Sequence, residues 1–413
     1  MRVAAIAMPQ SEVEAHVLLA LAVVVAAAWC AGWAISRVRQ PRVHGEIVVG
    51  ILLGPSLLGV IWPSALDYLF PTEVISALKV IAQIGLVLFM FLIGLDLDLD
   101  KLRGHGYKAA VISNVSILAP LALGSLLGIW LYPRLGEGVD ELGFVLFIGA
   151  AMAITAFPVL ARVLRETGLD RTRIGVLTMT CAAIDDVSAW CVLAIVVAVV
   201  KSDGPTATLR TVALSLLFLL VMRQVVKPLL ARMPNVSLWM AIAFALFCGW
   251  LTDQIGIHAI FGAFLAGAVM PRRREQQEAL RRQIEPTTLT FLLPVFFVVV
   301  GLATHINGLN SLYLWAITLL VLVTAIVGKW GGAMLAARAT GETWHAAASI
   351  GILMNTRGLT ELVILSVGLE LGVITTTMFT IMVIMALVTT LMATPLLALV
   401  SLERVSEGNV RAA

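Results

Sequence analysis

Charged residues are scarce in this chain of 413 residues. Asp, Glu, Lys and Arg together make up 13% of it, whereas 60% is hydrophobic, and the mean hydropathy is +1.00. Soluble globular domains carry about 25% charged residues. The composition therefore excludes an ordinary soluble domain and indicates an integral membrane protein, for which we expect no nucleic-acid partner.

Cysteine is also rare, and its positions argue against a redox or metal function. The four cysteines all fall inside apolar runs, and none forms a CxxC or metal-ligand spacing; they are Cys30, Cys181, Cys191 and Cys248. Free cysteines in such surroundings behave as small buried hydrophobic residues. We therefore expect inert thiols and no bound cofactor.

Apolar runs recur along the whole chain at lengths that cross a bilayer, for which a helix needs about 20 residues. We count thirteen and predict an all-α membrane fold. The predicted spans are 15–35, 43–61, 74–95, 107–132, 141–165, 173–200, 206–230, 237–252, 255–271, 288–304, 312–337, 343–369 and 373–400. The eighth and ninth are short and nearly contiguous, so a single kinked element is an alternative there.

Basic residues are distributed unevenly between the two ends of these spans. With the N-terminus placed outside and the spans alternating in direction, the inner side holds 21 Lys or Arg residues and the outer side holds 4. Cytoplasmic segments carry such an excess in membrane proteins. We therefore predict a multi-pass protein of the cell inner (plasma) membrane, with its N-terminus outside and its C-terminus cytoplasmic.

The one long hydrophilic stretch is residues 271–288, which read PRRREQQEALRRQIEPTT. On the predicted topology it lies at the inner face as a linker. A surface helix that joins two halves of the protein is one interpretation, and a site for the headgroups of membrane lipids is the other.

Two adjacent carboxylates, Asp185 and Asp186, stand in the middle of a span that is otherwise uncharged over residues 174–200. A charge at the centre of a membrane helix costs about 2.5–3.5 kcal/mol on insertion scales and usually marks function. Neighbours on a helix point about 100° apart, so the two side chains can face different partners. Lys329 and Arg357 lie at similar depth. A static buried ion pair is the alternative interpretation.

The fifth predicted span contains the signal for a broken helix. It reads AMAITAFPVLARVL, with Thr155 and Pro158 past its middle. Proline removes a backbone donor and clashes with the preceding turn, and breaks within a membrane are tolerated only where they line a cavity or are buried in protein. Thr155 is the hydroxyl closest to this break, so it is a candidate ligand for an ion.

The twelfth predicted span contains a second break signal, SIGILMNTRGLTELVIL, in which Asn355, Thr356 and Gly358 surround a full positive charge. Broken helices in corresponding places of two halves point to a transporter binding site. Arg357 can also serve a structural role by holding Glu361 and free carbonyls, and Asn355 and Thr356 can simply bond backbone groups that the break frees.

The spacing of these features suggests internal symmetry. The fifth and twelfth spans, the sixth and thirteenth, and the fourth and eleventh are each seven spans apart. An odd offset inverts the direction of a repeat in the membrane. We therefore predict inverted repeats, formed by spans one to six and eight to thirteen around span seven.

Several motifs together resemble the second monovalent cation:proton antiporter family of bacterial Na⁺/H⁺ and K⁺/H⁺ exchangers. They are HGEIVVGILLGPSLLG, LFMFLIGLDLDLDKL, ITAFPVLARVLRE, the DD of the sixth span, IHAIFGAFLAGAVMP and NTRGLTELVIL, in order over nearly the whole chain. The resemblance implies a homodimer in which each chain forms one transporter domain. Dimerisation and scaffolding would fall mainly to about 15–95 and 206–304, and an ion-binding core to about 107–200 and 312–400, with two broken helices crossing at the ion.

The resemblance also implies roles for individual residues. Asp186 resembles the essential carboxylate that binds the transported Na⁺ or K⁺, and Asp185 resembles its neighbour that pairs with a lysine, here Lys329. Members that are electroneutral or select K⁺ often lack that aspartate or the lysine. The presence of both favours electrogenic exchange of Na⁺, with Li⁺ as a further substrate, over K⁺/H⁺ exchange, which stays the alternative.

Two other functional classes use an inverted-repeat fold or buried aspartates. A Na⁺-coupled organic-anion symporter could use a similar inverted-repeat fold and is the more distant alternative. An intramembrane aspartyl protease needs its aspartates on different helices, and its GxGD signature is absent from the sequence. We therefore expect a transporter and not an enzyme.

Overall fold

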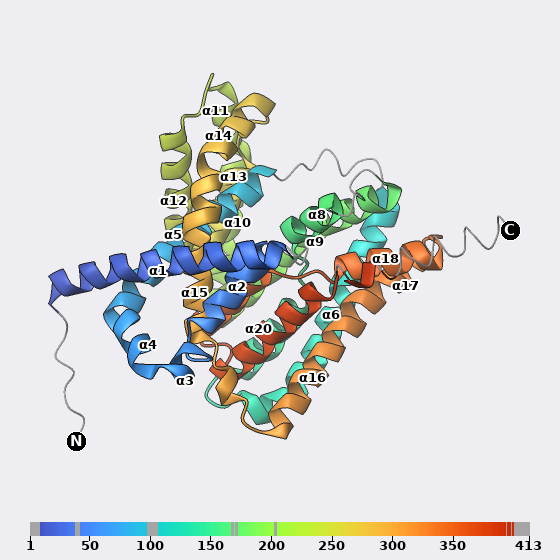
Figure 1. Cartoon of the computed structure of the whole chain (residues 1–413). Helices are drawn as coiled ribbons and strands as arrows, with labels where there is room; N and C mark the ends of the chain where they lie inside the picture. Colours follow the sequence, from blue (N-terminus) through green and yellow to red (C-terminus); the bar gives the residue numbers. More distant parts are fainter. Residues whose placement is uncertain are drawn as a thin grey trace. The chain divides into compact units, whose positions relative to one another are not determined.

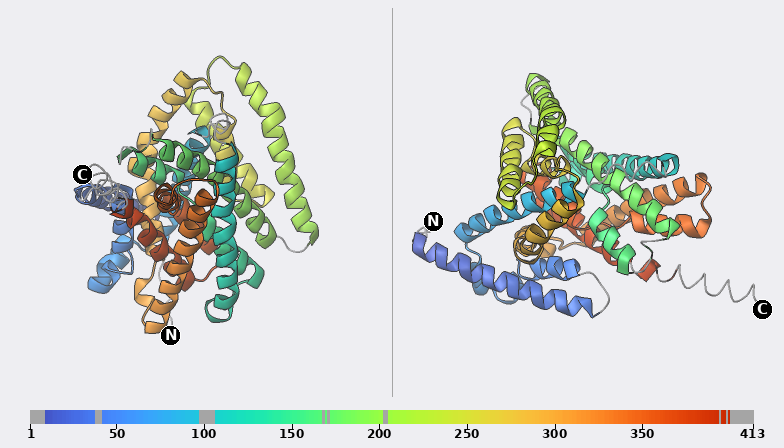
Figure 2. Two further views of the ribbon diagram at one scale, coloured as in Figure 1. Left: turned by 90° about the vertical axis from the view of Figure 1, so that its right-hand side faces the viewer. Right: turned by 90° about the horizontal axis from the view of Figure 1, so that it is seen from above.

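The structure is a computed structural model that describes residues 9–37, 42–96, 106–166, 169, 172–201, 205–393, 395–397 and 399. The described residues form helices joined by short connections, and no β-strand occurs among them (Figure 1, Figure 2). The predicted all-α class is confirmed.

Nine of the described helices are long and apolar enough to cross a membrane, judged by length and composition. Three further apolar helices are shorter: Glu141–Ala153, Ala259–Ala268 and Trp344–Met354. Two of these three belong to the predicted spans with break signals, and the interruptions explain why those spans yield no long helix. The count of thirteen spans and the orientation of the termini stay predictions.

The chain divides into two compact units. The first comprises Met1–Asp96, Leu219–Leu251 and Gly262–Asn307, and the second Leu97–Phe218, Thr252–Phe261 and Gly308–Ala413. The unit boundaries fall within helices α10 (Pro205–Val221), α12 (Leu238–Ile255) and α13 (Ala259–Ala268). Between α12 and α13 the backbone turns at Gly256, with φ of 103°, so these are two separate helices and not one kinked element.

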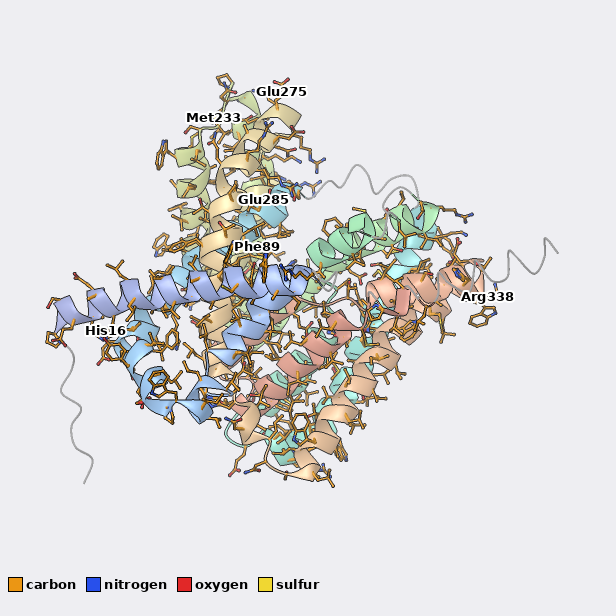
Figure 3. The ribbon with its side chains drawn as sticks, viewed as in Figure 1. His16, Phe89, Met233, Glu275, Glu285 and Arg338 are labelled. Atoms are coloured by element: carbon orange, nitrogen blue, oxygen red, sulfur yellow. The ribbon has the colours of Figure 1, made fainter. Side chains whose placement is uncertain are left out.

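The first unit draws its helices from three separate stretches of the chain. Its elements include α1 (Gln10–Ser36), α2 (Arg42–Leu52), α3 (Leu58–Ile61), α4 (Pro63–Leu69), α5 (Thr72–Asp96), η2 (Met222–Val226), α11 (Lys227–Arg232), α14 (Arg274–Thr287), η3 (Thr288–Leu292), α15 (Leu293–Ala303) and η4 (Ile306–Gly308). Most of the predicted linker 271–288 thus forms α14, which continues through the π-helical turn η3 into α15. Glu275 and Glu285 lie along it, and His16 lies on α1 (Figure 3).

Close approach of backbones holds the first unit together. A Cβ atom at Gly301 of α15 would overlap the carbonyl oxygen of Gly50 of α2, and one at Gly54 would overlap that of Gly301. Helices in lipid gain little from burying apolar surface, so small residues that permit close packing take over that role. The glycine spacing of this segment is therefore a packing feature.

The second unit contains every residue with a predicted role in ion binding. Its elements are α6 (Gly106–Leu135), α7 (Glu141–Ala153), α8 (Phe157–Glu166), α9 (Arg173–Lys201), α16 (Leu312–Ile326), η5 (Val327–Gly331), α17 (Gly332–Ala339), α18 (Trp344–Met354), α19 (Leu359–Glu370) and α20 (Thr376–Leu391). Helix α6 packs against α7, α9 and α17, and α9 also packs against α18. Apolar residues such as Ile112, Leu160, Leu177 and Ile350 form the buried core between these helices.

Candidate functional site

Two helices of the second unit are interrupted, and their interruptions meet. Helix α7 ends at Ala153 and α8 begins at Phe157, while α18 ends at Met354 and α19 begins at Leu359. The backbone N–H of Ala156 donates to the carbonyl of Thr356 at 3.0 Å and joins the two unwound segments. Four half-helices therefore converge on one buried point.

A proline follows the first interruption, and a glycine is the last residue of the second. Pro158 is the second residue of α8, a position where the missing N–H costs nothing, so it starts a half-helix. Gly358 has φ of 155°, and a Cβ there would lie 2.7 Å from the Cγ2 of Val159. A residue with a side chain would be strained at this point, which accounts for the glycine.

The second interruption is bonded largely within its own segment. The hydroxyl of Thr356 donates to the carbonyl of Leu353 at 2.7 Å, and the N–H of Asn355 donates to the carbonyl of Gly351 at 3.0 Å. Both polar side chains are buried, and the Oδ1 of Asn355 has no hydrogen-bond partner among the described residues.

Two buried cations bond the carbonyls at the end of α7. The guanidinium of Arg357 donates to the carbonyls of Ala151 at 3.0 Å and Met152 at 2.6 Å, and the ammonium of Lys329 donates to that of Ala153. The last carbonyls of a helix have no partner within the helix and attract positive charge. Both cations are fully buried.

Asp185 is satisfied by donors from three different elements. Its Oδ1 accepts from Ser113 at 2.6 Å, and its Oδ2 accepts from Ser116 at 2.6 Å, Thr155 at 2.9 Å and Lys329 at 2.9 Å. Lys329 lies in the π-helical turn η5, and such turns are frequent at functional sites. Both oxygens of this fully buried carboxylate therefore have hydrogen-bond donors.

Asp186, one residue further along α9, is in a different situation. It is 4% exposed, and its Oδ1 has no hydrogen-bond partner among the described residues. The backbone N–H of Phe157, at the start of α8, bonds its carboxylate. A buried, ionised carboxylate oxygen without a donor is costly to maintain, so a proton or a cation bound there would stabilise the site.

A second ion pair lies within the second interrupted helix. Arg357 donates to Glu361 at 2.9 Å, and both side chains are fully buried. The Nε of Arg357 and the Oε1 of Glu361 have no hydrogen-bond partner among the described residues. This pair is less completely bonded than the one between Lys329 and Asp185.

The buried charges around the two interruptions do not balance when all are ionised. Among the described residues there, the positive side chains are Lys329 and Arg357 and the negative ones are Asp185, Asp186 and Glu361, which leaves one negative charge in excess. One proton or one monovalent cation neutralises the set. Lys329 bonds Asp185 and Arg357 bonds Glu361, whereas neither cation donates a hydrogen bond to Asp186 in the described structure.

The structure thus brings together Asp185, Thr155 and Lys329 in one network and sets Asp186 beside it. Ser113 and Ser116 complete this network and are not among the residues predicted from the sequence. Their signal was weak: two hydroxyls three residues apart in a long apolar helix, a pattern that occurs in many membrane helices.

An ion cluster fastens one end of the second unit. Glu342, in the turn before α18, bonds Lys108 of α6 at 2.8 Å and Arg173 of α9 at 2.9 Å. The hydrogen bond from Lys108 and the charges of Lys108 and Arg173 lower the pKa of the Glu342 carboxyl below its ordinary value. This residue also lay outside the sequence predictions.

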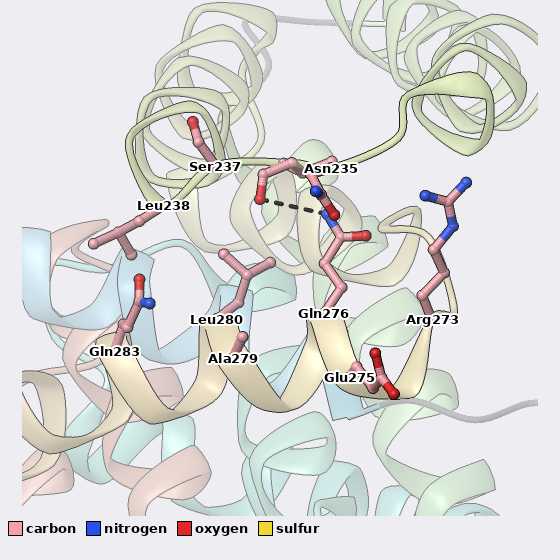
Figure 4. Close-up of a pocket in the computed structure, with 10 residues that line it drawn as sticks. Asn235, Ser237, Leu238, Arg273, Glu275, Gln276, Ala279, Leu280 and Gln283 are labelled. Atoms are coloured by element: carbon pink, nitrogen blue, oxygen red, sulfur yellow. Dashed lines mark hydrogen bonds between the residues drawn. The ribbon is translucent and has the colours of Figure 1, made fainter.

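The first unit contains a separate polar hollow of about 370 Å³ between α14 and the connection that leads into α12 (Figure 4). Gln276 donates across it to the carbonyl of Val236 at 3.4 Å, and Arg273 bonds the carbonyls of Ala231 and Pro234. These contacts fasten α14 to the connecting segment.

Comparison with known proteins places the chain among cation exchangers. Residues 8–401 match the family described as sodium/hydrogen exchanger, transmembrane. The chain is 42% identical to the Na⁺/H⁺ antiporter NhaS4 of Synechocystis sp. over 92% of this chain and 96% of that protein.

Eukaryotic relatives match over a similar stretch. The chain is 36% identical to cation/H⁺ antiporter 18 of Arabidopsis thaliana and 34% identical to K⁺/H⁺ antiporter 1 of Saccharomyces cerevisiae, over 92% and 90% of its length. It spans about half of these two relatives, 48% and 45% respectively.

The fold is shared with a solved structure. The sodium proton antiporter MjNhaP1 of Methanocaldococcus jannaschii matches 94% of this chain and 96% of its own with a TM-score of 0.61, at 15% sequence identity.

Proposed function

This chain belongs to the sodium/hydrogen exchanger family, and we propose that it exchanges Na⁺ for protons across the membrane at Asp186. A monovalent cation:proton antiporter needs one site that accepts either ion but not both together. One observation carries the assignment: the carboxylate of Asp186 has an oxygen without a donor, whereas Asp185 beside it accepts from four donors.

A proton and a Na⁺ ion compete for Asp186 because an unpaired charge is costly to bury. A proton neutralises the carboxylate, and a Na⁺ ion balances it while taking oxygen ligands. The free Oδ1 of Asn355 and the carbonyls of the two interruptions are oxygen donors in the same region. Because the empty, ionised site is costly to carry through hydrocarbon, the two fluxes are coupled.

Lys329 gives a basis for electrogenic exchange. It balances Asp185 while Asp186 carries a proton, and it releases its own proton when Na⁺ enters. Two protons per Na⁺ then move one net charge, which the membrane potential drives with about 2.3 kcal/mol per 100 mV. If Lys329 keeps its proton throughout, the exchange is one for one and electroneutral.

The second unit supplies the ion-binding core, and the first unit supplies the scaffold and the surface for a homodimer. The name of the relative from Synechocystis supports Na⁺ as the substrate. K⁺/H⁺ exchange is the second candidate, and the yeast relative of that name supports it.

The test is proton movement in reconstituted vesicles that contain a pH-sensitive dye, after addition of Na⁺, Li⁺ or K⁺. We expect Na⁺ to elicit the fastest response and Asp186→Asn to abolish it. Asp67→Asn, the same change at an exposed position of α4, is the matched control. Exchange that persists in Asp186→Asn contradicts the site, a larger response to K⁺ contradicts the selectivity, and a rate indifferent to an imposed voltage contradicts the two-proton scheme.

A further inference from the structure

The polar hollow of the first unit lies between α14 and the connection that leads into α12 (Figure 4). Its volume of about 370 Å³ is near the lower end of the range for small-ligand pockets, which is roughly 300–1,000 Å³. Val236 and Leu280 are buried and form apolar parts of its wall. The polar side chains that line it are Asn235, Ser237, Arg273, Glu275, Gln276 and Gln283. The hollow therefore suits a compact polar group.

The hollow borders the start of a helix that is able to cross a membrane. Helix α12 begins at Leu238, which lines the hollow, and it is long and apolar enough to span a bilayer. The next residue, Trp239, is 79% exposed. Tryptophan is enriched where hydrocarbon meets water, at the level of the lipid headgroups. We therefore expect the hollow at that depth, where phospholipid headgroups are abundant.

Gln276 has an incomplete set of hydrogen bonds in the hollow. Its amide nitrogen donates to the carbonyl of Val236 at 3.4 Å, whereas its buried Oε1 has no hydrogen-bond partner among the described residues. Buried polar atoms are normally bonded, and an amide oxygen can only accept, so the missing partner is a donor. Glu275 also lines the hollow and brings a negative charge. A cationic donor therefore fits better than a neutral one.

Arg273 supplies the positive charge of the lining. Its guanidinium donates to the carbonyl of Ala231 at 3.3 Å and to that of Pro234, which hold it in place. A guanidinium has five N–H donors, so these two bonds leave donors for a ligand. Arginine is well suited to phosphate oxygens. The hollow thus offers a site for a phosphate and, within one turn of the same helix, acceptors for a cationic donor.

We propose that this hollow binds the phosphoethanolamine headgroup of a membrane phospholipid. The phosphate bonds Arg273, and the ammonium donates to the Oε1 of Gln276 beside the carboxylate of Glu275. A glycerol headgroup brings no cation for Glu275, and a choline headgroup has the cation but no N–H to donate. The site is independent of the proposed exchange at Asp186. It lets the first unit recognise one lipid class of the surrounding bilayer.

The test is native mass spectrometry of the full chain in detergent, with phosphatidylethanolamine, phosphatidylcholine or phosphatidylglycerol of identical acyl chains. We expect phosphatidylethanolamine to bind about tenfold more tightly than either of the others, because each of them lacks one charge-assisted hydrogen bond. Arg273→Gln should weaken its binding about tenfold, and Glu275→Gln should remove the preference over phosphatidylglycerol. Glu278→Gln and Arg282→Gln are matched controls on α14. These two residues pair with each other outside the lining of the hollow, so binding should not change.

Four results would overturn the proposal. Equal binding of the three lipids contradicts the headgroup, and wild-type binding by the variants at Arg273 and Glu275 contradicts the site. Controls that lose as much binding as these variants show a general effect of charge. Glycerophosphoethanolamine, which lacks acyl chains, should bind far more weakly than the lipid, and equal affinity contradicts a membrane ligand. Because Arg273 also fastens α14 to the connection, melting temperatures without added lipid identify a loss of fold in its variant, and Glu275→Gln, at an exposed position, then decides.

Discussion

At the first interruption, residues 154–156, the end of α7 is bonded by charged side chains from other segments, Lys329 and Arg357. At the second, residues 355–358, the backbone is bonded within its own segment and turns at Gly358. The first interruption therefore depends in part on Lys329, whose charge can change during transport, and in part on Arg357, whose charge is permanent. The second depends on backbone geometry, which a change of protonation does not alter.

The two cations should differ in how much the fold depends on them. Arg357→Met leaves Glu361 buried without its donor and frees two carbonyls of α7, for an expected loss of about 3–5 kcal/mol of stability. Lys329→Met should cost less, because Asp185 keeps three hydroxyl donors. Melting temperatures in detergent check this order. An equal or larger loss for Lys329→Met would show that the cations contribute alike to both regions.

The backbone turn of the second interruption can be tested by adding a methyl group. Gly358→Ala combines a strained conformation with a contact to Val159 and should cost about 2–3 kcal/mol. Gly372→Ala is the control: its φ of 66° is also positive, but a Cβ there meets no atom within 4 Å, so about 1–2 kcal/mol is expected. Thermal unfolding of both variants gives the comparison. If the two losses match, the contact with Val159 contributes nothing.

The hydroxyl of the first interruption should contribute less than either. Thr155→Val keeps the shape and removes the donor to Asp185 and to the carbonyl of Met354, for an expected loss of about 1.5 kcal/mol. Thr155→Ser keeps the hydroxyl and should stay near wild type in melting temperature. A valine variant as stable as the serine variant would show that the hydroxyl is dispensable for stability.

The ion cluster at Glu342 lies outside both interruptions and should have the smallest effect. Its carboxyl has a lowered pKa in the folded state, so the pair with Lys108 and Arg173 stabilises the fold above the ordinary carboxyl pKa. That stability is lost as the pH falls through the lowered pKa. Glu342→Gln should therefore reduce stability by under about 1 kcal/mol at neutral pH and by nothing in strong acid. Melting curves across pH check the sign; a deficit that grows with acidification contradicts it.

The charged residues of the site could be predicted from the sequence, because charges are rare within membrane spans. Asp185, Asp186, Lys329 and Arg357 stand out because a charge in hydrocarbon is costly and usually marks a functional site. Ser113 and Ser116 do not stand out, because a hydroxyl in a membrane helix can bond its own backbone one turn earlier and needs no distant partner. Only the packing of α6 against α9 shows which hydroxyls face the carboxylate.

The helices were predictable from apolar length, but their irregular parts were not. Pro158 indicated a break, yet the unwound residues precede it, because proline is favoured in the first turn of a helix. The π-helical turn at Lys329 has no signature in composition, since it depends on how a helix packs. Glycine and polar residues together are unusual within an apolar span, and those around Gly358 lie between the end of α18 and the start of α19.

The hydrogen bond from Ala156 to Thr356 joins two stretches of chain that are 200 positions apart in sequence. It fixes the crossing of the four half-helices as a pivot shared by both halves of the core. The bonds from Arg357 to the carbonyls of Ala151 and Met152, and from Thr155 to that of Met354, join the same two stretches. A displacement of one stretch is therefore transmitted to the other, and we expect the four half-helices to move as one body when the ion changes sides.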